Sequence, residues 1–166
     1  MNKPTATSLI DHFQLKPLPH EGGYFVESYR AEHLWDTLPS QYSGPRSAGT
    51  AIYYLLTSDT VSRFHRLRSD EIWHFYAGDA VELIMLRPDG KGQAVRLGPL
   101  ILQNEQCQVV VPRSAWQGAQ LAAGGDWALM GCTVAPGFSF DDFELASTES
   151  LHHQYPDWRH WIQKLT

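Results

Sequence analysis

The stretch Ser62-Arg63-Phe64-His65-Arg66-Leu67-Arg68-Ser69-Asp70-Glu71-Ile72-Trp73-His74-Phe75-Tyr76-Ala77-Gly78 holds the densest group of chemically active side chains in this 166-residue chain. Two short segments, 62–67 and 71–76, are separated by polar residues that suit a turn. Short segments of this kind, rich in aromatic and aliphatic residues and bounded by turns, are typical of β-strands. The stretch therefore predicts two consecutive strands, with His65 on the first and Glu71 on the second.

The same pattern extends along the chain on both sides of this stretch. From Gly22 onward, short segments rich in Tyr, Val, Ile, Leu and Trp alternate with turns that contain Gly or Pro. The predicted strands are Tyr24–Ala31, Thr50–Thr57, Ser62–Leu67, Glu71–Tyr76, Val81–Arg87, Ala94–Leu97, Gln106–Val111, Gly118–Leu121 and Trp127–Val134. Because no helix separates them, we expect an antiparallel β-sandwich or barrel.

Helices are expected only at the two ends of the chain. Apolar residues at helical spacing predict a short helix within Thr5–Leu15, and a closing helix over Glu149–Leu165 that Pro156 interrupts. The segment Ala31–Ser47 is the only long irregular connection, and its position suits a cover for a pocket mouth. The acidic residues within 141–144 are expected to form a solvated turn over the end of the barrel.

Composition limits the classes to which the protein can belong. Apolar residues make up 43% of the chain, aromatic residues 12% and charged residues 19%, which excludes disordered, collagen-like and coiled-coil proteins. The net charge of -5 has the wrong sign for a nucleic-acid backbone or an anionic membrane. We expect one mainly β domain over residues 1–166, with its barrel core at about 22–145.

Targeting signals and cysteines indicate a cellular compartment. No segment approaches the roughly 18 apolar residues of a membrane-spanning helix, and Met1–Thr5 lacks the apolar stretch of a secretory signal. We therefore expect a cytoplasmic protein. In that reducing compartment Cys107 and Cys132 are expected to be reduced thiols on core strands.

Residues 65–78 resemble the first motif of the cupin superfamily. That motif runs His, one residue, His, three or four residues, Glu, six residues, Gly. His65, Leu67, Glu71 and Gly78 stand at these four places, so three of the four residues match and a leucine replaces the second histidine.

The second cupin motif, Pro-x-Gly-x-x-His, has an altered counterpart in Pro112-Arg113-Ser114-Ala115-Trp116-Gln117. Ser114 stands in place of the glycine and Gln117 in place of the histidine. The phrases His20-Glu21-Gly22-Gly23-Tyr24 and Gly125-Asp126-Trp127-Ala128-Leu129 are similar to one branch of the superfamily, the small single-domain cupins filed as a domain of unknown function. The resemblance covers about residues 10–155. It implies a jelly-roll barrel around a pocket, and a homodimer or larger homo-oligomer formed through a sheet face.

Metal binding requires several donors that converge, such as three histidines and one glutamate. Here only His65 and Glu71 remain at the matching places, and Gln117 offers a weaker amide oxygen. Strand alternation puts His74 on the face opposite to Glu71. We therefore expect no tightly bound metal or other cofactor. The alternative is a metal-dependent oxygenase or lyase that uses His65, Glu71 and Gln117.

Without a metal, His65 and Glu71 form a candidate catalytic pair. A neutral imidazole oriented by a carboxylate can remove a proton next to a carbonyl. The pair resembles that of metal-free cupins that epimerise nucleotide-linked sugars with a His base, a carboxylate and a Tyr acid. Candidates for the acid are Tyr24, Tyr53, Tyr54 and Tyr76. The other interpretations are a structural His–Glu hydrogen bond and a cupin that binds or stores a ligand without catalysis.

Four further residues are candidates for ligand binding. Arg63 has the strand parity of His65 and is expected to reach a phosphate or carboxylate inside the barrel. Trp116 and Gln117 combine a stacking face with an amide, and Trp73 shares the face of Glu71. This set suits a small polar ligand such as a sugar or nucleotide.

Overall fold

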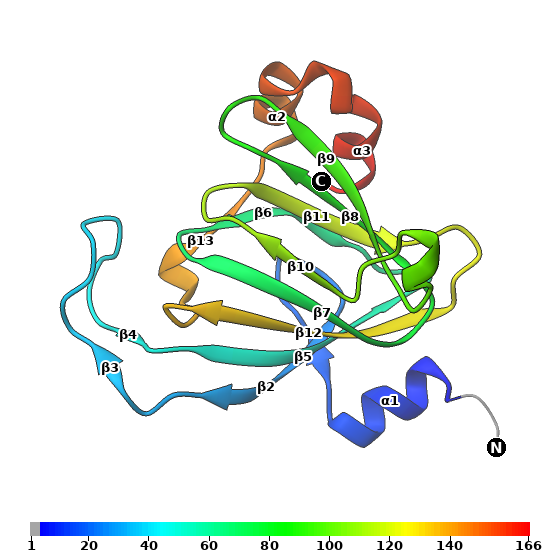
Figure 1. Cartoon of the computed structure of the whole chain (residues 1–166), viewed down its shortest axis with the longest axis horizontal. Helices are drawn as coiled ribbons and strands as arrows, with labels where there is room; N and C mark the ends of the chain where they lie inside the picture. The colour runs from blue at the N-terminus through cyan, green and yellow to red at the C-terminus, as the bar shows by residue number, and fades with distance from the viewer. Residues whose placement is uncertain (1–3) are drawn as a thin grey trace.

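The computed structural model describes residues 4–166, which form two facing antiparallel sheets with short helices at the ends of the chain (Figure 1). The larger sheet contains, in spatial order, β1 (Lys16–Pro17), β2 (Tyr24–Arg30), β5 (Thr50–Thr57), β12 (Trp127–Ala135), β7 (Asp70–Gly78) and β10 (Gln108–Val111). The smaller sheet contains β13 (Phe143–Leu145), β6 (Ser62–Leu67), β11 (Trp116–Leu121), β8 (Val81–Leu86) and β9 (Gly92–Leu97). This arrangement confirms the predicted antiparallel barrel.

All nine predicted strands are present: two have the predicted bounds, and the other seven differ by one or two residues at one or both ends. The structure adds four strands of two or three residues, β1, β3 (Leu34–Trp35), β4 (Arg46–Ser47) and β13, which are too short to carry a periodic signal. Strand β10 begins at Gln108, not at 106 as predicted, so the expectation that Cys107 is a core thiol is wrong: its side chain is exposed. Cys132 is buried on β12, as expected.

The main core lies between the two sheets. Side chains alternate along each strand, so every second residue points inward. Tyr54, Trp73 and Met130 of the six-stranded sheet pack there against residues of the five-stranded sheet such as Leu83 and Ala119. The cavity described below occupies one end of this interior.

The outer faces of both sheets are partly covered by helices. Helix α1 (Ala6–Phe13) packs beside Leu15, which follows it, and beside Leu55, Trp127 and Leu129 of the six-stranded sheet. On the five-stranded sheet, Phe64, Ile84 and Trp116 pack against the C-terminal segment, which consists of α2 (Thr148–Gln154), η3 (Pro156–Trp158) and α3 (Arg159–Lys164). Fully burying one side chain such as Phe64 stabilises the fold by about 1.5–3 kcal/mol.

Local signals explain where these helices begin and end. Thr5 and Ser8 form a reciprocal capping box at the start of α1, and Gln14 ends the helix in the left-handed conformation. The predicted closing helix is divided at Pro156, which has no N–H to donate within a helix. No helix in residues 4–166 is long and apolar enough to cross a membrane. The prediction that Met1–Thr5 lacks the apolar stretch of a secretory signal falls partly on residues 1–3, which lie outside the described residues.

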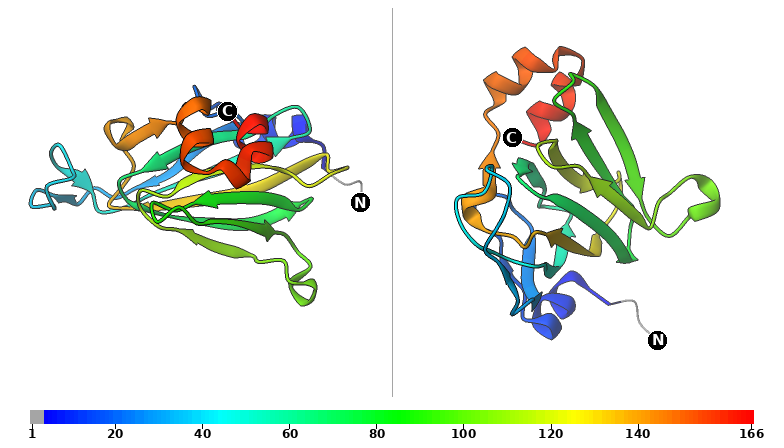
Figure 2. Two further views of the ribbon diagram at one scale, coloured as in Figure 1. Left: turned by 90° about the horizontal axis from the view of Figure 1, so that it is seen from above. Right: turned by 60° about the vertical axis from the view of Figure 1, so that its left-hand side comes forward.

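One end of the barrel carries an extended arm. The β3–β4 hairpin projects from the body of the molecule at this end (Figure 2). The segment η2 (Phe140–Asp142) follows β12 at the same end. Arg46 of the hairpin and Asp142 of η2 are both buried and make two hydrogen bonds, of 2.7 and 2.9 Å. This ion pair fastens the arm to the barrel.

Candidate functional site

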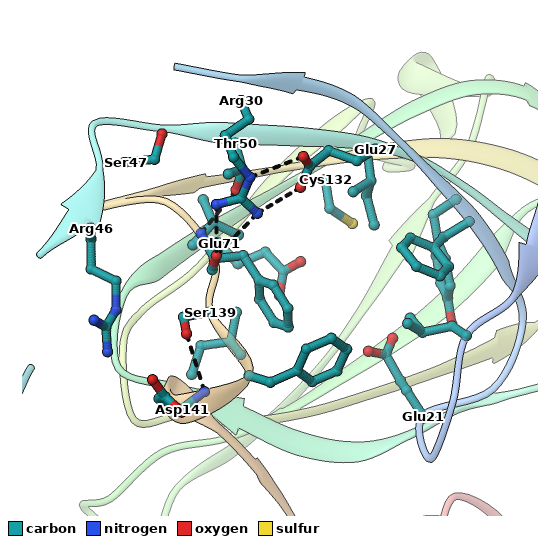
Figure 3. A pocket seen from close by; sticks show the side chains of 18 of the residues that line it. Glu21, Glu27, Arg30, Arg46, Ser47, Thr50, Glu71, Cys132, Ser139 and Asp141 are labelled. Carbon is teal, nitrogen blue, oxygen red and sulfur yellow. Dashed lines mark hydrogen bonds and ion pairs between the residues drawn. The ribbon is translucent and has the colours of Figure 1, made fainter. Parts of the chain in front are cut away.

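A cavity of about 580 Å³ opens at the end of the barrel near the β3–β4 arm (Figure 3). Its volume is in the usual range of about 300–1,000 Å³ for small-molecule sites. Most of its wall is apolar and is formed by Leu18, Phe25, Leu34, Ile52, Leu67, Val134, Phe138 and Phe140. Residues 34 and 45–47 line it as well, which agrees with the prediction that the 31–47 segment covers a pocket mouth.

Three titratable side chains meet in the wall of this cavity. The Nε2 atom of His65 lies 3.8 Å from Oε2 of Glu21 and 4.0 Å from Oε2 of Glu71. All three residues are buried. The Nδ1 atom of His65 lies 2.8 Å from the carbonyl oxygen of Arg63, to which it donates a hydrogen bond. The other ring nitrogen is therefore the one that faces both carboxylates.

A bulge in strand β6 brings Ser62 and His65 to the same face. Gln117 of β11 pairs with His65, whereas Ala119 pairs with Ser62, so β6 has one more residue than its partner over this interval. The hydroxyl of Ser62 donates a 2.9 Å hydrogen bond to Oε1 of Glu21. The bulge therefore aims two side chains at the glutamate.

Glu71 is held in place by two residues of the barrel core. The amide Nε2 of Gln117 donates a hydrogen bond to Oε2 of Glu71. The amide oxygen of the same residue accepts a 2.8 Å hydrogen bond from Nε1 of Trp73. The orientation of Gln117 is thus fixed by two partners, and one carboxylate oxygen of Glu71 is fixed in turn.

These partners do not fit the metal site that the cupin motifs imply. The amide of Gln117 turns its NH₂ group toward Glu71 and its oxygen toward Trp73, so no amide oxygen points at a shared centre with His65. Within residues 4–166, no group of three or more His, Cys, Asp or Glu side chains is arranged to hold a metal ion. The alternative ligand set of His65, Glu71 and Gln117 is therefore not assembled.

The electrostatics of the cluster favour a protonated histidine. Burial lowers the pKa of His65, but the carboxylates of Glu21 and Glu71 raise it more, and the resulting pKa is about 9. This pKa differs from the expectation that His65 is a neutral base, because the sequence did not reveal that two carboxylates face its ring. At neutral pH the ring is an imidazolium, which can donate a proton.

Glu21 is suited to accept a proton, in contrast to His65. Burial raises the pKa of Glu21, and the partly compensating effects of His65 and the Ser62 hydroxyl do not restore its usual value. A carboxyl group with a raised pKa is a better proton acceptor than an ordinary surface glutamate, because its basicity is closer to neutral pH. The cluster therefore combines a proton donor and a proton acceptor at one place.

Residues 7–146 match the model of the family described as Cupin superfamily (DUF985). This chain belongs to that cupin family. A solved structure from Shewanella oneidensis is 38% identical, with a TM-score of 0.88, over 99% of this chain and 98% of the other. A hypothetical protein from Leishmania major is 33% identical, with a TM-score of 0.89, over 98% of this cupin and 99% of its own chain.

Two more distant proteins are also similar to this chain. An uncharacterised protein of Saccharomyces cerevisiae is 29% identical over 158 residues, which are 87% of this cupin and 77% of that protein. Oxalate decarboxylase of Bacillus subtilis is 14% identical, with a TM-score of 0.56, over 93% of this cupin and 37% of that chain. The latter likeness shows the cupin fold alone.

Two of the predicted ligand-binding residues lie away from the cupin cavity. Arg63 is exposed and does not line it, because the bulge in β6 reverses the strand parity on which that prediction depended. Trp116 packs on the outer face of the five-stranded sheet, and the guanidinium of Arg66 lies 4.4 Å from its ring centre. Because Trp116 and Gln117 are adjacent on β11, they must point to opposite faces.

The other predicted residues lie behind the cavity wall, on the opposite face of the sheet, or in the cavity lining. Gln117 donates a hydrogen bond to Glu71 and accepts one from Trp73, and neither residue is in the cavity lining. His74 lies on the other face of β7, as predicted, with Nε2 2.5 Å from Oγ1 of Thr133. Of the four candidate tyrosines only Tyr54 lines the cavity, and its hydroxyl donates to the carbonyl oxygen of Gly22.

Sequence reasoning missed Glu21 and Cys132 as parts of the wall. Glu21 stands in a Gly-rich turn far from the cupin motifs, and no spacing links it to His65. Burial raises the pKa of the Cys132 thiol, and the carboxylates of Glu71 and Glu21 raise it further. The thiol is therefore uncharged at neutral pH, which argues against a nucleophilic role.

The histidine cluster makes the stability of this cupin depend on pH. An unfolded histidine has a pKa of about 6.5, whereas the folded value for His65 is about 9. Its contribution is complete below about pH 6.5 and is lost as the pH rises through about 9. Between about pH 6 and 9.5, the free energy of unfolding should fall by about 3 kcal/mol more for the wild type than for His65→Gln. Urea unfolding at both pH values measures this difference, and equal pH dependence of the two proteins would contradict it.

Proposed function

We propose that this cupin is a metal-independent isomerase that moves a proton next to a carbonyl group of a small molecule. The observation that carries the proposal is one imidazole between two carboxylates in the wall of a largely apolar cavity. Sites that transfer protons pair titratable groups whose environments change their pKa values for complementary roles. His65 and Glu21 form such a pair.

The proposed step uses three side chains in distinct roles. Glu21 takes the proton from the carbon next to the carbonyl, and the electron pair of that C–H bond forms a C=C bond. The Nε2–H group of His65 gives its proton to the carbonyl oxygen, so an α-hydroxy carbonyl substrate becomes an enediol. Glu71, held by Gln117, keeps His65 charged.

The second half of the reaction restores both groups. Glu21 returns its proton to the former carbonyl carbon, and His65 recovers a proton from the other enediol hydroxyl. The product is the isomer in which the carbonyl and hydroxyl positions are exchanged, with no net gain or loss of protons. The apolar wall supports this chemistry, because charges interact more strongly where water is excluded.

Exchange of substrate hydrogen with solvent tests the proposed function. The wild-type protein, dialysed against a chelator, is incubated in D₂O with α-hydroxy ketones, aldoses, ketoses and nucleotide-linked sugars. We expect deuterium to appear at the carbon next to the carbonyl, together with the isomeric product, as followed by NMR. Absence of exchange over the whole panel, or exchange that requires added metal, would overturn the proposal. Tight retention of a ligand without exchange would instead support a non-catalytic binding protein.

A further inference from the structure

We infer that the substrate is an uncharged molecule with an apolar body that ends in an α-hydroxy carbonyl group, and that phosphorylated ligands are excluded. This inference rests on the proposed function and names the substrate class of the same cavity. It differs from the sugar or nucleotide ligand that the sequence suggests. Three features of the cavity wall carry it.

The first feature is that both arginines of the wall already hold a carboxylate. Arg30 donates from Nε and Nη2 to the two oxygens of Glu27, at 3.0 and 2.7 Å, and also donates to the carbonyl of Phe138. Arg46 binds Asp142 in the same two-point manner. A phosphate would need the fork of donors that these carboxylates occupy.

A bulge in strand β2 explains the first of these pairs. Glu27 pairs with Ile52 of β5 and Arg30 pairs with Thr50, although the two β2 residues are three apart. The extra residue puts both side chains in the cavity lining, where they are partly exposed and neutralise each other (Figure 3). Arg30 is thus already paired with Glu27 where it lines the cavity.

The second feature is the balance of charges around the cavity. Its lining includes four acidic side chains, Glu21, Glu27, Glu71 and Asp141, and three basic ones, Arg30, Arg46 and His65. Asp142, which is not in the lining, adds a further negative charge 2.7 Å from Nε of Arg46. An anion that entered this space would meet no excess of positive charge.

The third feature is the apolar wall of the same cavity. Phe25, Ile52 and Phe138 are among the apolar side chains that line it. A sugar with hydroxyls on every side would lose water from groups that such a wall cannot hydrogen-bond. A molecule that is polar at one end alone can place that end at His65, Glu21 and Glu71 and its apolar body against the apolar wall.

Two α-hydroxy ketones test the inference directly. Phenylacetylcarbinol is uncharged with an aromatic body, and dihydroxyacetone phosphate is a small anion. We expect enzyme-dependent deuterium exchange in D₂O to be at least about 100-fold faster for the first, and the first alone to raise the melting temperature. Equal or faster exchange of the phosphate would overturn the substrate class and leave the proposed reaction standing. Stabilisation by phenylacetylcarbinol without any exchange would uphold the class and overturn the reaction, and no response to either compound would overturn the inference.

A matched pair of variants tests the role of the arginine. Glu27→Gln removes the charge that occupies Arg30, so the preference for phenylacetylcarbinol over the phosphate should fall at least about 10-fold. Glu144→Gln removes the partner of Arg66, an arginine outside this cavity, and should leave that preference unchanged. An unchanged preference in Glu27→Gln would contradict the exclusion mechanism.

Discussion

Replacing Glu21 with glutamine is expected to lower the rate of substrate proton exchange by about 100- to 10,000-fold, the usual contribution of a general base. The substitution keeps the size of the side chain and its capacity to hydrogen-bond the Ser62 hydroxyl. It removes the carboxylate that accepts the proton. Exchange of phenylacetylcarbinol in D₂O, followed by NMR, measures the loss.

The stability of the same variant separates catalysis from folding. Because burial raises the pKa of Glu21, its ionisation costs folding free energy at neutral pH, and the substitution removes that cost together with the attraction to His65. Glu21→Gln should therefore keep a melting temperature close to that of the wild type. A variant that stays folded and retains full exchange would show that Glu21 is not the base.

The substitution Asp142→Asn is expected to lower the free energy of unfolding by about 3 kcal/mol. It leaves the guanidinium of Arg46 buried without a charged partner. That guanidinium also donates to the carbonyl oxygens of Gly44 and Pro45, so the effect should extend into the β3–β4 arm. Urea unfolding measures the change in stability.

An exposed ion pair provides the control for this substitution. Arg66 and Glu144 make a similar two-point contact, but both are substantially exposed. Surface pairs contribute about 0–1 kcal/mol, so Glu144→Gln should change stability by no more than that. If both substitutions had equally small effects, the Arg46–Asp142 pair would not be what fastens the arm.

Much of the fold could be predicted from the chain alone. Strands such as β5 and β6 were predicted at both ends, because apolar segments between turn residues specify them locally. The closeness of His65 and Glu71 also followed, since the first cupin motif puts them on consecutive strands. What could not be predicted depends on contacts between distant segments.

Three residues illustrate that limit. Glu21 reaches the site from a turn that only the assembled barrel brings beside His65. Arg63 is exposed because one extra residue in β6 reverses the alternation of side chains along the strand. No local sequence pattern predicts this bulge. Asp142, expected in a solvated turn, is buried because Arg46, 96 positions earlier in the chain, pairs with it.

Gln117 and Trp116 illustrate a different cause. The predicted strand begins at Gly118, which leaves Trp116 and Gln117 outside it, and the two side chains are expected to contribute together to one ligand site. In the structure β11 begins at Trp116, and strand alternation separates the two side chains. An error of two residues at a strand end therefore changed the proposed ligand contacts.

The charge state of His65 is the claim on which the mechanism depends, and NMR can measure it directly. The ¹⁵N shifts of both ring nitrogens are followed from about pH 5 to 10, with His65→Gln used to assign the signal. We predict that both nitrogens of His65 carry protons at neutral pH and that the ring titrates with a pKa of about 9. A ring that is neutral at pH 7, with a pKa at or below the ordinary value of about 6.5, would contradict the proposed roles of His65 and Glu21.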